Sequence, residues 1–165
     1  MKAITAFNNI ILKILDVITI VLVVSMVGAL LIQVVARYFF NTGFAWTEES
    51  ARFMMIFLTY LGASMISLNG KHVNITIVED ALNGWAYTAL KVFQELVMLV
   101  FLVMIITFSV GALRIAGLSV SPAIGVNMAH IVRIVPIGAA LMFLGHLTRV
   151  LKFLIAAKKG EFKTV

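Results

Sequence analysis

The chain has 165 residues, 62% of them hydrophobic, with a net charge of +6 and no cysteine, which excludes disulfides, thiolate metal sites and thiol nucleophiles. Its mean hydropathy of +1.11 is far above that of a soluble domain, so we expect lipid as the solvent and no separate catalytic domain. Seven of the thirteen Lys and Arg residues lie near the two ends of the sequence, which suits a membrane face and membrane lipids better than nucleic acid, so no nucleic-acid partner is predicted.

Four uncharged stretches, residues 17–36, 53–70, 96–113 and 134–148, contain 20, 18, 18 and 15 residues. At about 1.5 Å per residue the first three can cross a hydrocarbon core of about 30 Å. The fourth is short, but Arg133 and Arg149 flank it and can reach the headgroups, so we expect its helix to extend past both. The sequence predicts an all-α integral membrane protein, a single domain over residues 1–165 with transmembrane helices at about 17–36, 51–70, 93–113 and 131–149.

The first span is too long for a signal-peptide core, and no Ala-x-Ala cleavage pattern follows it, so we interpret it as a retained anchor. Apolar residues between Phe7 and Ile18 recur at helical spacing, while Asn9, Lys13 and Asp16 share the other side. This pattern indicates either a short amphipathic helix on the membrane surface or a span that begins early.

The orientation follows from the basic residues. With four spans, the two tails and the middle loop lie on one side and hold nine of the thirteen Lys and Arg residues. The positive-inside rule therefore predicts that both termini are cytoplasmic. Residues 73–82 in the middle loop are expected to form a second short surface helix. Aromatic and basic residues near the span ends are expected to anchor the chain at the membrane interface, namely Arg37, Trp46, Lys71, His72, Trp85 and Arg149.

The densest polar cluster lies before the second span, where Thr47 or Glu48 is expected to cap the helix and Arg52 follows Glu48 by four residues and Glu49 by three. One interpretation is a charged helix start with local ion pairs. The other is a docking surface for a partner protein. Acid–base catalysis is disfavoured, because adjacent carboxylates on one helical turn diverge.

Small and hydroxyl residues recur inside the spans. In the second span Thr59, Tyr60, Ser64 and Ser67 fall near one face beside Gly62, and Gln33 in the first span should seek a hydrogen bond across helices. Such a stripe marks helix packing or a substrate path. Packing is favoured, because the second span has no ionisable residue at mid-membrane. The predicted subunit-interface residues are Gln33, Glu48, Glu49, Arg52, Tyr60, Gly62 and Ser64.

The three histidines, His72, His130 and His146, lie in different segments without a metal-ligand spacing, so no metal site is predicted. His146 is expected to hydrogen-bond to a neighbour or reach the interface, with a proton relay as the alternative. No phosphate-binding glycine motif is present. We predict no cofactor, no catalytic or substrate-binding residue, and no enzyme activity.

Four motifs follow one another in a fixed order: RYFFN (37–41), WTEESAR (46–52), FLTYLGA (57–63) and GKHV (70–73). This series resembles the small membrane subunit of tripartite ATP-independent periplasmic (TRAP) transporters, the DctQ-like family. Its members show an aromatic-Glu-Glu-x-x-Arg segment, a Leu-Gly-Ala step and a Gly-x-His turn. The resemblance extends over essentially the whole chain.

The resemblance implies a scaffold subunit in a sodium-driven symport complex of the bacterial inner membrane. Its partners would be a large multi-span, DctM-like transport subunit and, transiently, a periplasmic binding protein that delivers an organic acid, either sialic acid or a dicarboxylate. Glu48, Glu49 and Arg52 would then order the boundary or meet a partner, and Lys71 and His72 would anchor the cytoplasmic turn. A self-sufficient channel or exporter working as a homo-oligomer is the alternative, and an enzyme or enzyme anchor is a third class.

Overall fold

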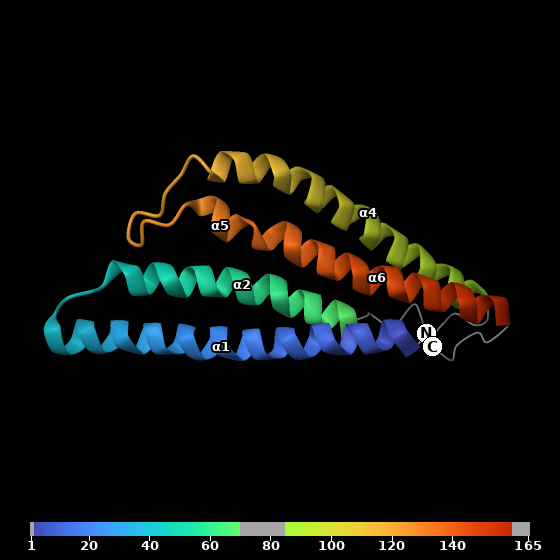
Figure 1. Ribbon diagram of the computed structural model, residues 1–165, viewed down its shortest axis with the longest axis horizontal. Coiled ribbons are helices and arrows are strands. Elements are labelled where there is room, and N and C mark those ends of the chain that lie inside the picture. The colour runs from blue at the N-terminus through green and yellow to red at the C-terminus, as the bar shows by residue number, and fades with distance from the viewer. Residues whose placement is uncertain (1, 70–84, 160–165) are drawn as a thin grey trace.

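The computed structural model describes residues 2–69 and 85–159. The helices are α1 (Lys2–Phe40), α2 (Ala45–Asn69), α4 (Trp85–Ala116), α5 (Met128–Val132) and α6 (Ile134–Lys159) (Figure 1). Four helical segments are long and apolar enough to cross a membrane, which confirms the predicted all-α fold with four spans. Lys71, His72 and the surface helix predicted at 73–82 lie outside the described residues.

The first span is part of one continuous helix of 39 residues, Lys2–Phe40. The segment before residue 17 therefore continues the same helix as the predicted span. Its two predicted placements, on the membrane surface or within a span that begins early, stay predictions. At about 1.5 Å per residue α1 is roughly 58 Å long, well beyond a hydrocarbon core of about 30 Å. Leu15, which precedes the predicted span, is buried in a small apolar cluster with Leu61 and Ile134.

The fourth span consists of α5 and α6, which are interrupted at Arg133. Pro136 has no amide hydrogen to donate to the carbonyl of Val132 four residues earlier, which accounts for the break at this point. Asn127 caps α5, because its side-chain oxygen accepts a hydrogen bond from the Ala129 amide at 2.9 Å. As predicted, the helical segment extends past Arg133 and Arg149.

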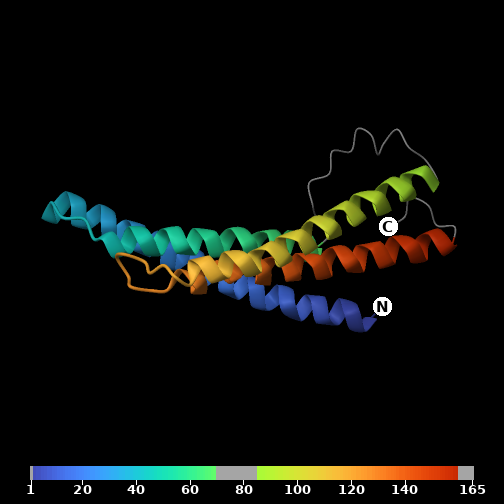
Figure 2. The ribbon, with the colours of Figure 1, turned by 90° about the horizontal axis from the view of Figure 1, so that it is seen from above.

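The long helices form a flat array rather than a closed bundle. α2 packs between α1 and α6, and α6 packs between α2 and α4, so that α1 and α4 form the two edges (Figure 1). Seen from above, α1 crosses the other helices at an angle (Figure 2). Because one layer encloses little volume, many large apolar side chains remain exposed, such as Val24 at 67% and Phe108 at 72%. Lipid or another protein must cover them.

The contact between α2 and α6 is made by small residues. The Ser64 hydroxyl donates to the carbonyls of Tyr60 at 2.7 Å and Gly138 at 3.1 Å. The Ser67 hydroxyl donates to the Met142 carbonyl at 3.1 Å. Both serines are fully buried, so helix packing is confirmed for these two positions of the stripe. Thr59, by contrast, is exposed and donates to Met55 of its own helix.

Candidate functional site

Polar side chains gather at both ends of the helix array. We call Glu48, Glu49, Arg52 and the loop of residues 117–127 the outer cluster, and Ser67, Glu95, His146 and Arg149 the inner cluster. The two clusters lie at opposite ends of α2, because Glu49 follows the start of this helix and Ser67 precedes its end. They therefore fix the helix array from both sides of the span.

The outer cluster is built on Glu49. Its Oε2 atom accepts hydrogen bonds from the backbone amides of Ala123 at 2.9 Å and Ile124 at 3.1 Å. Two peptide donors converge on one carboxylate oxygen, a charge-assisted arrangement stronger than bonds between neutral groups. Glu49 thus ties the connection between α4 and α5 to the first turns of α2, across 74 and 75 residues of sequence.

The loop that Glu49 holds is ordered by its own hydrogen bonds. The Ser121 amide donates to Val126 at 2.8 Å, the Gly125 amide donates to Ser121 at 3.0 Å, and the Met128 amide donates to Ser119 at 3.0 Å. Gly125 has φ +75°, a conformation that glycine adopts without strain. This turn directs the amides at 123 and 124 toward the carboxylate of Glu49.

The neighbouring Glu48 has a different environment. It pairs with Arg52 at 3.3 Å, with side-chain exposures of 58% for Glu48 and 65% for Arg52. The predicted local ion pair is therefore confirmed, while its energetic contribution at such exposure is small. The capping role predicted for Thr47 or Glu48 is wrong. The helix begins at Ala45, and the Thr47 hydroxyl donates to the Phe44 carbonyl at 2.7 Å instead of accepting from an amide.

The inner cluster joins three helices around Glu95 of α4. Glu95 Oε1 accepts from Arg149 Nη1 at 3.0 Å, and Glu95 Oε2 lies 2.5 Å from Nδ1 of His146. Because a carboxylate is an acceptor, we assign the hydrogen of this short bond to Nδ1. The second Arg149 nitrogen, Nη2, donates to the Ser67 carbonyl of α2 at 2.7 Å. Glu95 and His146 are both buried.

The position of Ser67 explains the second Arg149 contact. The last four carbonyls of a helix lack intrahelical partners, and α2 ends at Asn69. A guanidinium at this end also interacts favourably with the helix dipole. The Arg149 side chain is only 15% exposed and turns inward to Glu95 and Ser67, while its predicted anchoring at the membrane interface stays a prediction. Hydrogen bonding of His146 to a neighbour is confirmed.

A further basic residue lies one turn before Glu95. Lys91 is buried, and its Nζ lies 5.8 Å from the centre of the Tyr87 ring, within the range of a cation–π contact. The inner ends of α4 and α6 thus place Lys91, Glu95, His146 and Arg149 in buried or nearly buried positions. Charge at such positions is stable only when it is paired and hydrogen-bonded.

The remaining predicted interface residues are not part of either cluster. Ser64 is buried inside the chain, where Tyr60 also packs close to Gly138. Gln33 is half-buried, and its side chain makes no hydrogen bond within residues 2–69 and 85–159. At Gly62 an added Cβ would meet nothing within 4 Å. Among the described residues, Gln33 thus lacks the hydrogen bond across helices that was predicted for it, and Gly62 has open space beside it.

The predicted anchors that the structure describes lie near helix ends. Arg37 belongs to the last turn of α1, Trp46 to the first turn of α2, and Trp85 begins α4. All three residues are exposed. This placement suits the interfacial role predicted for them.

Comparison with known proteins gives the family. The sequence model of the DctQ component of tripartite ATP-independent periplasmic transporters matches residues 26–155, which include both polar clusters. The chain belongs to this family. The resemblance expected from the four ordered motifs is thus confirmed. This family is a component of transporters, and the four helices long and apolar enough to cross a membrane fit a multi-pass inner-membrane protein.

Relatives support the assignment. The chain is 31% identical over 100 residues to a putative TRAP transporter small permease protein of Haemophilus influenzae, covering 61% of this chain and 60% of the relative. It is 29% identical over 110 residues to SiaQ, the sialic acid TRAP transporter small permease protein of Vibrio cholerae, covering 67% of this chain and 59% of SiaQ. The chain therefore spans about three fifths of the length of these two relatives.

A third relative is much longer. The sialic acid TRAP transporter permease protein SiaT of Haemophilus influenzae is 23% identical over 121 residues, which cover 73% of this chain but only 20% of SiaT. In SiaT, a segment similar to this DctQ component is thus joined to a far larger permease chain.

Sequence reasoning missed the inner cluster as a unit. Glu95 and Arg149 directly flank the uncharged stretches 96–113 and 134–148 on the predicted cytoplasmic side. Both residues are thus expected at the same depth in the membrane, which was a signal that their side chains could form an ion pair. The contact between Glu49 and the loop had no comparable signal, because backbone amides carry no side-chain pattern.

Proposed function

We propose that this DctQ component is the scaffold subunit of a sodium-driven TRAP transporter that imports an organic acid of the sialic acid or dicarboxylate type. It assembles with a large, DctM-like transport subunit, and a periplasmic binding protein delivers the substrate. The observation that carries the proposal is the flat array of helices, fixed at both ends by polar clusters and covered with exposed apolar side chains.

A scaffold must keep its shape while its partner moves. Here the outer cluster fixes the loop to α2, the small-residue contact joins α2 to α6, and the inner cluster joins α2, α4 and α6. The long exposed apolar faces must be covered by lipid or by another membrane protein. A large membrane subunit can pack against one of these faces while lipid continues to cover the others. The SiaT relative, in which a similar segment is part of a longer permease, supports a partner of this size.

The distribution of charge favours a scaffold over a carrier. Among the described residues of the four spans, charged side chains lie toward the helix ends, as at Arg52, Glu95 and Arg133. An organic acid at mid-membrane needs cationic or helix-end groups there. We therefore place the substrate and sodium sites in the large subunit. The sialic acid transporters among the relatives suggest the substrate class.

The proposal is tested by purifying the tagged chain from its native membrane in a gentle detergent and identifying bound proteins by mass spectrometry. We expect one large multi-span membrane protein in a fixed ratio. Reconstituted with it and with the binding protein, the chain should be required for organic-acid uptake that depends on a sodium gradient. A homo-oligomer that conducts or transports alone would instead support the small channel or exporter.

Glu49 provides a sharper test at the outer cluster. Replacing Glu49 with alanine removes both hydrogen bonds that hold the loop, so we expect several-fold faster hydrogen exchange at Ala123 and Ile124 and reduced uptake by the reconstituted complex. Glu48→Ala is the matched control. It removes an adjacent carboxylate whose exposed pair with Arg52 contributes little. Equal exchange rates in both variants would show that Glu49 does not hold the loop.

A further inference from the structure

Three hydrogen-bond donors of the loop at residues 117–127 converge on Glu49. Its Oε2 atom accepts from the backbone amides of Ala123 at 2.9 Å and Ile124 at 3.1 Å, and the Ser121 hydroxyl donates to the same carboxyl group. An ionised carboxylate only accepts hydrogen bonds, whereas a protonated carboxyl carries a donor of its own. The loop therefore matches the charged form of Glu49.

This contact depends on the charge of Glu49 and not on an ion pair with the loop. Residues 117–127 contain no ionisable side chain. Hydrogen bonds to an ionised carboxylate are roughly twice as strong as those between neutral groups. A proton on Glu49 therefore weakens the bonds to Ala123 and Ile124 without any chemical change in the loop.

The pH range follows from the surroundings of Glu49, which lies just before the predicted second span (51–70) and is half-buried. The hydrogen bond from Ser121 holds the pKa of Glu49 below its ordinary value of 4.5, and partial burial opposes this effect. The amides of Ala123 and Ile124 and the charge of Arg52 lower the pKa further. Because the pKa is lower in the folded than in the unfolded chain, the contact stabilises the fold above pH 4.5 and is lost as the pH falls through the folded-state pKa.

Other ionisable groups at the outer end could also respond to pH. Arg52 acts on Glu49 by its charge and pairs with Glu48 at 3.3 Å. Arg133 Nη1 lies 3.2 Å from His130 Nδ1. Histidine side chains ordinarily change charge between about pH 5 and 8, so the effect of His130 must be measured separately. The remaining ionisable residues of α1 and α4 near this end are Arg37, Tyr38 and Arg114.

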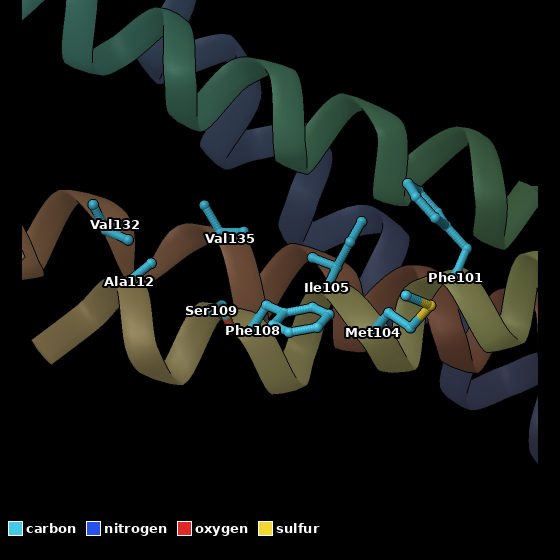
Figure 3. A pocket seen from close by; sticks show the side chains of 8 residues that line it. All are labelled: Phe101, Met104, Ile105, Phe108, Ser109, Ala112, Val132 and Val135. Atoms are coloured by element: carbon cyan, nitrogen blue, oxygen red, sulfur yellow. The ribbon is translucent and has the colours of Figure 1, made fainter. Parts of the chain in front are cut away.

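The packing beside the loop contains no titrating group. Ala112 of α4, Val132 of α5 and Val135 of α6 line one shallow apolar groove (Figure 3). Ser109 is its polar lining residue, and none of the lining side chains is ionisable. A change of the loop with pH therefore has its source in the ionisable groups around Glu49.

We propose that Glu49 is an acid-sensitive latch, which holds the loop against α2 while its carboxylate is charged and releases the loop when the carboxylate takes up a proton. With the predicted orientation the latch faces the periplasm. Release frees the connection between α4 and α5 from α2, while the inner cluster and the Ser64 contact continue to join α2, α4 and α6. The outer end of the array thus loosens while the array stays assembled. This inference does not depend on the transport role.

The test is amide hydrogen exchange of the full chain in lipid nanodiscs between about pH 3 and 7, a range that brackets the ordinary titration of glutamate. Each rate is divided by the rate of an unstructured peptide at the same pH, which removes the intrinsic effect of pH on exchange. Protection of Ala123 and Ile124 should fall several-fold below pH 4.5. Ala139 of α6, which is buried in the array, should keep its protection.

Three variants identify the group that takes up the proton. Glu49→Gln keeps an oxygen that accepts hydrogen bonds but does not titrate, so protection of the loop should be lower at neutral pH and should not change with pH. Glu48→Gln and His130→Gln are the controls and should keep the transition of the original protein. The proposal is overturned if the transition persists in Glu49→Gln, disappears in His130→Gln, is absent from the original protein, or coincides with loss of protection at Ala139.

Discussion

Replacing Glu95 with alanine should lower the free energy of unfolding by about 3 to 5 kcal/mol, the usual cost of removing one partner from a buried ion pair. The variant removes the acceptor for Arg149 Nη1 and the contact with His146, both in positions with little exposure to water. The measurement is unfolding of the purified protein in mixed micelles of increasing SDS content, followed by circular dichroism.

The control is Glu48→Ala, which breaks an ion pair at 58% and 65% side-chain exposure and should change the unfolding midpoint little. Arg149→Lys is a second comparison. Lysine keeps the charge but lacks the planar guanidinium that bridges Glu95 and the Ser67 carbonyl. Its free energy of unfolding should therefore lie between those of Glu95→Ala and the original protein. If Glu95→Ala and Glu48→Ala unfold at the same SDS content, the inner cluster does not hold the three helices together.

Replacing Gly145 with alanine should separate α2 from α6. A Cβ at this position would lie 2.7 Å from Ser67 Oγ and 2.8 Å from the Ser67 carbonyl oxygen and carbon. Backbone atoms cannot rotate away as a flexible side chain can, so the helices must move apart. We expect the free energy of unfolding, measured in the same SDS titration, to fall by about 1 to 3 kcal/mol. Because Arg149 also donates to the Ser67 carbonyl, the inner cluster should loosen as well.

Gly62→Ala is the matched control for this experiment. It lies in a neighbouring span, and its Cβ would meet nothing within 4 Å. Alanine is the better helix former by about 1 kcal/mol, so this variant should be as stable as the original protein or slightly more stable. If Gly145→Ala and Gly62→Ala lower the free energy of unfolding equally, the contact with Ser67 does not explain the result. The cause would then be a general effect of replacing a transmembrane glycine.

Gly62 also provides a comparison within the complex. Within this chain its position is open, and it remains a predicted contact with the large subunit. If the Gly62→Ala variant is stable alone but less of the large subunit co-purifies with it, that prediction is supported. If the same amount of the large subunit co-purifies with the variant and with the original protein, Gly62 is not a subunit contact.

The sequence by itself determined the membrane class, the number of spans and the family. Long uncharged stretches between basic residues are visible without any structure, because the hydrocarbon core sets the length that a helix must have. Contacts between residues close in sequence could also be predicted. The pair of Glu48 and Arg52 follows from a spacing of four residues on one helix.

Only the tertiary structure decided which helices are neighbours and which polar groups meet. Lipid is as apolar as the side chains of a span, so hydrophobicity does not select the face that packs against another helix. The order of the array, with α2 and α6 inside and α1 and α4 at the edges, therefore could not be predicted from the composition. Once that order is set, Arg149 turns inward to Glu95 across 54 residues of sequence, and Glu49 meets a loop 74 residues away.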